Sequence, residues 1–177
     1  KGIELDGVYK ITRKLSLEGL ISLGDWITDT KKKVYIYDAN EALVDSVDFS
    51  AQKVHVGDAA QTQLGGSIRF EPIKGLYIKA NYTWFGKNYA NFDPLTLTGT
   101  NADRESWKMP NYSLFDLHAG YEFKCWKLRM NIGANVMNVL DIHYMTDAQN
   151  GYDFNVATSL VYFGQGRRFN TSFKITF

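Results

Sequence analysis

The sequence predicts an all-β fold, a transmembrane antiparallel β-barrel to which this chain contributes the C-terminal segment. Apolar and polar residues alternate with a period of two in about seven segments, each close to the roughly 9–11 residues of a membrane strand. The connections between these segments are alternately short and long, as in bacterial barrels. Aromatic residues make up 15% of the 177 residues, while the average hydropathy is negative, a combination typical of strands with one lipid-facing side.

Each predicted strand has an apolar face and a polar face, as Ile3, Leu5 and Tyr9 alternate with Glu4 and Asp6. The strands are expected at residues 3–11, 15–23, 63–71, 76–84, 115–123, 128–136 and 168–177. Short turns are expected at residues 12–14, 72–75 and 124–127, and long polar loops at 26–60, 86–111 and 138–165. The short turns would lie on the periplasmic side and the long loops outside.

The polar face carries too many charges for the dry interior of a soluble sandwich, whose strands also average only about 5–6 residues. We expect this face to line a water-filled or plugged lumen. The predicted lumen-facing or plug-facing residues are Lys79, Asn81, Asp116, His118, Glu122, Arg129, Asn131, Arg168 and Lys174. Aromatic residues near both strand ends fit the belts found at membrane interfaces.

Strand parity predicts that the barrel extends beyond this chain. Phe177 would lie on the periplasmic side, and counting back seven strands places Lys1 on the loop side. Bacterial single-chain barrels have an even number of strands with both ends periplasmic. Residues 1–177 are therefore expected to be the C-terminal portion of a larger barrel domain, with earlier strands and a signal peptide upstream. The single cysteine, Cys125, excludes an internal disulfide framework.

The end of the chain resembles the assembly signal of bacterial outer-membrane proteins. Phe169, Phe173 and Ile175 occupy alternate positions, and Phe177 is the terminal aromatic residue. The barrel-assembly machinery reads this signal by pairing with the strand edge, and side-chain pockets accept every second residue. The resemblance implies a location in the bacterial outer membrane.

Three further segments resemble the last strands of TonB-dependent receptors, and the resemblance is closest to the receptors of Bacteroidetes. Residues 135–144 read NVMNVLDIHY, residues 162–168 read YFGQGRR, and residues 109–116 read MPNYSLFD. The chain departs from the family at Gly166-Arg167, where many members have Pro-Arg. The resemblance implies a 22-stranded barrel filled by an N-terminal plug that lies outside this chain. It also implies active import of a large scarce nutrient, a siderophore, haem, cobalamin, glycan or peptide, driven through the TonB complex.

The predicted partners are outer-membrane lipid, the rest of the barrel and its plug, the TonB complex through the missing N-terminal region, and a surface lipoprotein in some such importers. Aromatic residues in the long loops are candidates for the substrate mouth, namely Tyr89, Trp107, Tyr144 and Tyr152. The net charge of +1 offers no basic field for nucleic acid.

No motif predicts an enzyme or a bound cofactor. Asp116 and His118 share a face, but no third ligand stands at a suitable spacing, so hydrogen bonding within the lumen accounts for them. Acidic loop residues could bind calcium or remain solvated, since they lack an EF-hand spacing; they are Asp93, Asp103, Asp147 and Asp153. The run Lys31–Lys33 is either a lipopolysaccharide contact or a solvated face.

Three other functions remain open at this stage. A passive outer-membrane porin would show the same strands without a plug. A non-transport barrel, such as an adhesin or a protease, would show catalytic or adhesive groups at its rim. A soluble β-sandwich lectin would need no membrane.

Overall fold

The computed structural model describes all residues, 1–177, and contains only strands and three single 3-10 turns. The strands are β1 (Gly2–Lys10), β2 (Leu15–Gly24), β3 (Ile27–Tyr37), β4 (Leu43–His55), β5 (Thr62–Phe70), β6 (Leu76–Gly86), β7 (Tyr112–Cys125), β8 (Leu128–Met137), β9 (Met145–Gln149), β10 (Leu160–Phe163) and β11 (Arg168–Thr176). The 3-10 turns are η1 (Pro94–Thr96), η2 (Gly99–Asn101) and η3 (Val156–Thr158). None of these turns has the length or apolarity of a membrane-spanning helix. The all-β prediction is confirmed.

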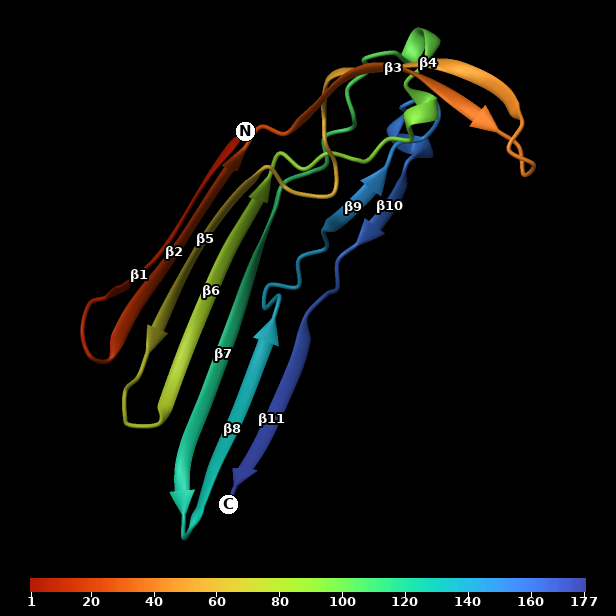
Figure 1. Ribbon diagram of the computed structural model, residues 1–177. Coiled ribbons are helices and arrows are strands. Elements are labelled where there is room, and N and C mark those ends of the chain that lie inside the picture. Colours follow the sequence, from red (N-terminus) through yellow and green to blue (C-terminus); the bar gives the residue numbers. More distant parts are fainter.

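Seven strands form one antiparallel sheet in the order β1-β2-β5-β6-β7-β8-β11 (Figure 1). These are the seven strands that the alternation predicts. β7 begins at Tyr112, three residues before the predicted start, because Tyr112–Leu114 continue the pairing with Phe85–Thr83 of β6. Neighbouring strands are joined by short turns at one end of the sheet and by long connections at the other.

The register places side chains of the seven strands in rows that cross the sheet, and two adjacent rows differ in polarity. One complete row is apolar, and its members are Tyr9, Leu17, Ile68, Ala80, Leu117, Val136 and Phe169. The adjacent row, on the opposite face, is polar or charged, and its members are Lys10, Ser16, Arg69, Lys79, His118, Asn135 and Asn170. Adjacent residues point to opposite faces of a strand. The predicted division into two faces is therefore confirmed in these rows, while Val8 and Leu20 are apolar residues on the polar face.

The sheet is a single layer, and nothing covers its apolar face. The large apolar side chains exposed there are Ile3, Leu5, Tyr9, Leu17, Ile21, Leu23, Leu64, Ile68, Phe70, Ile78, Tyr82, Tyr121, Ile132, Phe169, Phe173 and Ile175. Monomeric soluble proteins rarely expose contiguous apolar patches beyond a few hundred Å². The fold thus presents an apolar surface that needs an apolar environment.

The protein's core lies in the long connections, which fold together at one end of the sheet. We call residues 25–61, 87–111 and 138–167 the loop cap. Its main apolar cluster consists of Phe49, Ala51, Val54, Leu97 and Phe154, one or more from each connection. A second cluster consists of Ala90, Met109 and Ala148. The long polar connections are predicted correctly in place, and within them two hairpins form, β3–β4 and β9–β10.

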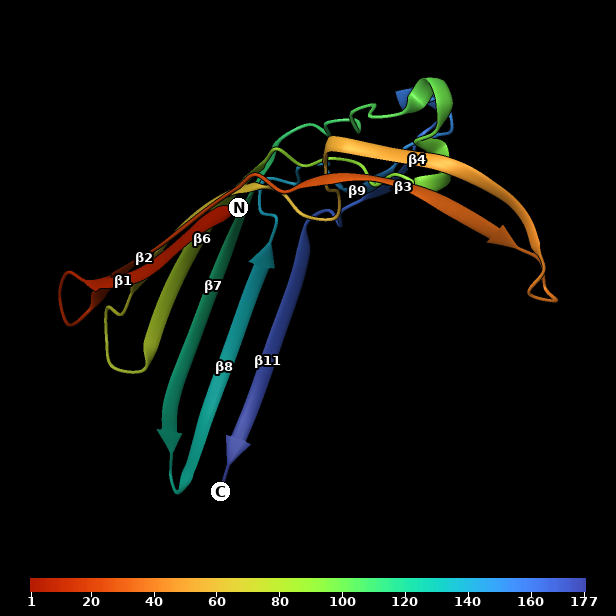
Figure 2. The same ribbon diagram turned by 45° about the horizontal axis from the view of Figure 1, so that its top comes forward.

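The β3–β4 hairpin projects sideways from the loop end, well past β11 in both views (Figures 1 and 2). The turns Ile11–Lys14, Glu71–Gly75 and Trp126–Lys127 lie at the other end together with the C-terminus, whereas the N-terminus lies beside the loop cap. The predicted placement of Lys1 on the loop side is confirmed by its backbone hydrogen bonds with Asp25. The sheet is open, with β1 and β11 at its two edges.

The loop cap has its own buried core, so a cavity made there should loosen the cap and leave the sheet intact. Leu97 is 0% exposed within the main cluster. We expect Leu97→Ala to destabilise the cap by about 2–5 kcal/mol. Hydrogen exchange should rise in residues 43–55 and 145–163 and stay unchanged in β5–β8. Leu95→Ala removes an exposed leucine two residues away and serves as the control. Equal exchange in the two variants would contradict an independent cap core.

Candidate functional site

A hydrogen-bonded chain of side chains crosses the polar face at His118. Asn81 Nδ2 lies 2.9 Å from His118 Nε2, and His118 Nδ1 lies 2.8 Å from Asn135 Oδ1. Asn135 Nδ2 continues the chain toward Asn170 Oδ1 at 3.5 Å. An amide nitrogen can only donate and an amide oxygen can only accept, so this arrangement fits a neutral imidazole protonated at Nδ1. The chain of side chains through His118 therefore connects β6, β7, β8 and β11.

An ion pair on the same polar face links β6 to β2. Lys79 Nζ lies 2.5 Å from Glu18 Oε2, and Ser67 Oγ donates to the same oxygen at 2.9 Å. Glu18 was not among the lumen residues selected from the sequence, although it alternates correctly with Leu17. Its partner lies 61 residues away in the chain, so only the register reveals it.

The other residues predicted to face the lumen lie on this polar face as well. Glu122, Asn131 and Lys174 form one cross-strand row, and Arg129 Nε approaches Glu122 Oε1 at 3.5 Å. Asp116 accepts a hydrogen bond from the Asn138 backbone at 2.7 Å. Arg168 pairs with Gln165 at the start of β11. Whether a plug or water meets these groups stays a prediction.

The side chains of Asp116 and His118 make hydrogen bonds to amide groups. His118 is bonded to two amides and not to a carboxylate, and Asp116 is engaged by a backbone N–H group. Nowhere in the protein do three or more His, Cys, Asp or Glu side chains gather in a way that could hold a metal ion. The hydrogen-bonding interpretation of this pair is the one that the geometry supports.

The sequence motif at residues 135–144 forms a polar knot where β8 meets the loop cap. Asn138 is 3% exposed and has a positive φ of 50°. Its Oδ1 accepts from the Ile142 backbone N–H at 2.9 Å, while its Nδ2 donates to the carbonyls of Ile142 at 2.9 Å and Gln165 at 3.3 Å. Asp141 Oδ1 accepts from the Arg167 backbone N–H at 2.7 Å. These bonds tie the end of β8 to the start of β11.

The second motif, residues 162–168, belongs to the same knot. The Gly164 N–H donates to the Tyr144 carbonyl at 2.8 Å, and the Tyr144 ring lies so close to Gly164 that a Cβ atom there would collide with it. Tyr144 also stacks on Tyr112 at 4.6 Å, and Tyr112 stacks on Phe85 at 4.8 Å. Two motifs separated in the sequence thus make one junction between the sheet and the cap.

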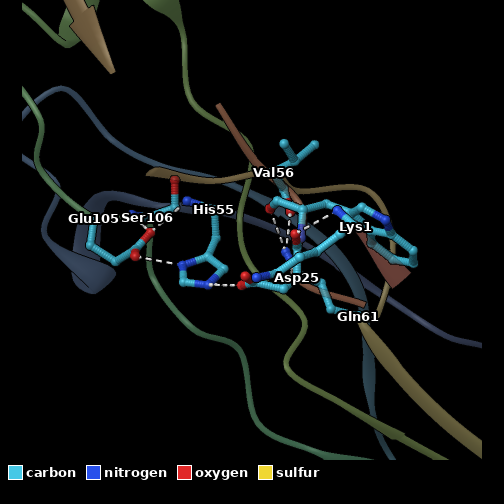
Figure 3. A network of polar contacts seen from close by, with 8 residues as sticks. Lys1, Asp25, His55, Val56, Gln61, Glu105 and Ser106 are labelled. Carbon is cyan, nitrogen blue, oxygen red and sulfur yellow. Dashed lines mark hydrogen bonds and ion pairs between the residues drawn. The ribbon is translucent and has the colours of Figure 1, made fainter. Parts of the chain in front are cut away.

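A polar clasp, which Figure 3 shows, joins separate parts of the loop cap next to the end of β2. His55 Nδ1 lies 2.6 Å from Glu105 Oε2, and His55 Nε2 lies 3.7 Å from Asp25 Oδ1. The His55 ring stacks on Tyr89 at 4.2 Å. The clasp joins the end of β2, the end of β4 and the second long connection. Burial, followed by the charges of Glu105 and Asp25, raises the pKa of the Tyr89 hydroxyl.

Gln61 fixes the two ends of the first long connection. It is 0% exposed, and its Oε1 accepts from the Trp26 backbone N–H at 3.2 Å while its Nε2 donates to the Trp26 carbonyl at 2.9 Å. Its Nε2 also reaches the Val56 carbonyl at 3.4 Å, so every polar atom of this buried side chain is satisfied. Nothing in the local sequence distinguishes Gln61 from a loop residue.

The aromatic residues predicted for the substrate mouth separate into two groups. Tyr89 is 8% exposed beneath His55, Trp107 packs against the second apolar cluster, and Tyr144 belongs to the knot. These three support the cap. Tyr152 is 85% exposed and is the one whose ring is open to a ligand.

Each of the four acidic loop residues accepts a hydrogen bond within the cap. Asp103 accepts from Ser50 Oγ at 2.6 Å and from the Gln52 N–H at 2.7 Å, and these bonds lower the pKa of its carboxyl. Asp153 accepts from Thr158 Oγ1 at 2.6 Å, and this bond, followed by the Asn155 N–H, lowers the pKa of its carboxyl. Asp93 caps η1, and Asp147 bonds the next backbone N–H. The four carboxylates do not converge.

The residues of the predicted assembly signal lie on the edge strand. Phe169, Phe173 and Ile175 point to the apolar face of β11, and Phe177 follows its end. Phe169 is 73% exposed, and the outer edge of β11 has no partner strand. This geometry is the one required for recognition by strand addition.

No family model matches the chain, and no curated protein matches it.

The polar knot should be essential for holding β11 on the sheet. Asn138→Ala removes the side-chain partner of three backbone groups and strains a positive φ. We therefore expect a loss of about 1–3 kcal/mol in the free energy of unfolding. Asn138→Gly keeps the backbone conformation and removes only the amide. Denaturant titration of the whole barrel should rank wild type above the glycine variant and the glycine variant above or equal to the alanine variant. Wild-type stability in both variants would contradict the role of the knot.

Proposed function

We propose that this chain is a sector of an outer-membrane β-barrel that imports a large nutrient with energy from the TonB system. The observation that carries the membrane part of the proposal is the uncovered seven-stranded sheet, apolar on one face and polar on the other. Lipid would cover the apolar face and a plugged lumen the polar face.

Strand direction supports a larger barrel. Seven antiparallel strands make the first and the last run the same way, so β1 and β11 are parallel to each other. Direct closure between them would create one parallel seam. An odd number of additional strands would close the barrel with antiparallel pairs throughout and remove both open edges, which lipid does not tolerate.

The loop cap supports an active importer over a simple pore. Three connections of the sheet share one apolar core, and the His55–Glu105 pair joins the first connection to the second. Together they form a shaped outer surface at one end of the sheet. A shaped mouth can bind a specific ligand, whereas a passive pore needs only an open one. The similarity of residues 109–116, 135–144 and 162–168 to TonB-dependent receptors points the same way.

Energy-dependent uptake distinguishes this proposal from a passive porin. Cells expressing the full-length protein should take up its nutrient only while the inner membrane is energised. A protonophore, or deletion of TonB, should abolish accumulation while surface binding persists. Uptake that continues under either treatment would favour a passive porin and would contradict the proposed energy-dependent import.

The two faces of β8 make a direct test of membrane insertion. Ile132→Lys places a charge on the apolar face, and we expect it to destabilise the barrel in lipid vesicles by about 2–4 kcal/mol. Asn131→Lys places the same charge on the polar face next to Glu122 and should change stability by less than about 1 kcal/mol. Denaturant unfolding in vesicles measures both. An equal loss in the two variants would argue against lipid on the apolar face.

A further inference from the structure

The charges of the protein are separated along the direction of the strands. The loop cap holds thirteen acidic and eight basic residues. The three short turns at the other end hold one acid, Glu71, and four cations. We call these cations the basic rim; they are Arg13, Lys14, Lys74 and Lys127. The overall net charge of +1 thus arises from an acidic cap and a basic remainder.

The cations of the basic rim have no anionic partner within the protein. The acid of the turns is already paired, because Arg69 Nε lies 3.0 Å from Glu71 Oε1. Glu122, near the end of β7, is approached in the same way by Arg129 at 3.5 Å. All four rim side chains are exposed, and none of them takes part in an ion pair. Their charges are therefore open to an anion from outside the chain.

Trp126 occupies a strained position at the tip of the last short turn. Its φ is 57°, a region that bulky side chains rarely adopt, although glycine adopts it readily. The residue is 87% exposed, and Lys127 Nζ lies 5.5 Å from the centroid of its ring. A large ring that is held outward at a position suited to glycine points to a contact outside the chain.

Apolar side chains connect the basic rim to the apolar face of the sheet. Ile73 is 56% exposed in the second turn, and Phe177 is 98% exposed beyond the end of β11. Tyr121 and Phe123 stack at 5.3 Å near the end of β7, and Tyr121 pairs with Ile132 in the register. The positive charges thus lie at the border where the apolar face ends. A lipid whose acyl chains cover that face has its head group at this border.

We propose that the basic rim and Trp126 bind the head groups of anionic phospholipids in the leaflet on the short-turn side. The arginine and lysine side chains pair with lipid phosphates, and the indole ring lies among the head groups. Continuity with the apolar face favours a membrane over an acidic protein segment, and the acidic cap disfavours the same lipids at the opposite end. This inference rests on the membrane location in the proposed function and is independent of how import is energised.

Native mass spectrometry of the full-length protein in neutral detergent tests the proposal. The probes are equal amounts of phosphatidylglycerol and phosphatidylcholine. One positive charge near an anionic lipid strengthens association roughly fivefold, so wild type should retain phosphatidylglycerol about fivefold more tightly than phosphatidylcholine. The variant Arg13→Gln/Lys74→Gln/Lys127→Gln should lower this ratio toward one.

Trp126→Gly separates the ring from the charges. Glycine suits the positive φ of this position, so the turn should keep its shape. The variant should retain both lipids more weakly and keep the ratio between them. Retention of both lipids at the wild-type level would overturn the role of Trp126.

Lys31→Gln/Lys32→Gln/Lys33→Gln is the matched control, because it removes the same number of positive charges from the loop cap. It should leave the ratio unchanged. An equal ratio in wild type and the rim variant, an equal loss in the control, or rim-dependent binding of polyglutamate in place of phosphatidylglycerol would overturn the inference. Uptake without energy would contradict the import mechanism and leave the rim standing. An equal loss of stability in the Ile132→Lys and Asn131→Lys variants would contradict the membrane location itself.

Discussion

A one-layer antiparallel sheet needs a different environment on each of its faces whenever its side chains are sorted by polarity. Here the row that contains Ile68 and Leu117 is apolar, while the adjacent row on the opposite face contains Lys79 and His118. Backbone hydrogen bonds are satisfied within the sheet except at the edges of β1 and β11. The remaining requirement is an apolar medium on one side and a polar one on the other. A membrane barrel meets both requirements at once.

The polar face and the loop cap depend on that arrangement in different ways. Polar side chains on this face, including Glu18, His118 and Asn170, form hydrogen bonds between strands. These bonds help to fix the register of a sheet that has no core of its own. The cap has a conventional core and is held together by the His55 clasp. It is joined to the sheet where the Asn138 backbone N–H donates to Asp116 of β7. The cap can therefore keep a fixed shape, as a binding surface requires, above strands that have no covering layer.

Periodicity predicted the seven strands and both of their faces because these strands are long and alternate regularly. It failed in the long connections, where β4 and β9 contain mixed residues and pair only locally. The polar-face residues were predictable from alternation, but the pairing of Glu18 with Lys79 depends on register. The motif at residues 135–144 could be seen in the sequence, and the structure supplies its physical reason in the bonds of Asn138 and Asp141. Gln61 carried no signal, since burial in a folded loop cannot be deduced from an isolated polar residue.

The central claim is that lipid covers one face of the sheet and water or protein covers the other. The most direct measurement is the accessibility of spin labels at adjacent positions of β5 in a bilayer, with Cys125→Ser as the background. We predict that a label at Ile68→Cys is relaxed mainly by dissolved oxygen, and that a label at Ser67→Cys is shielded from oxygen and sensitive to a polar nickel reagent. Equal access of the nickel reagent to both labels would contradict the account.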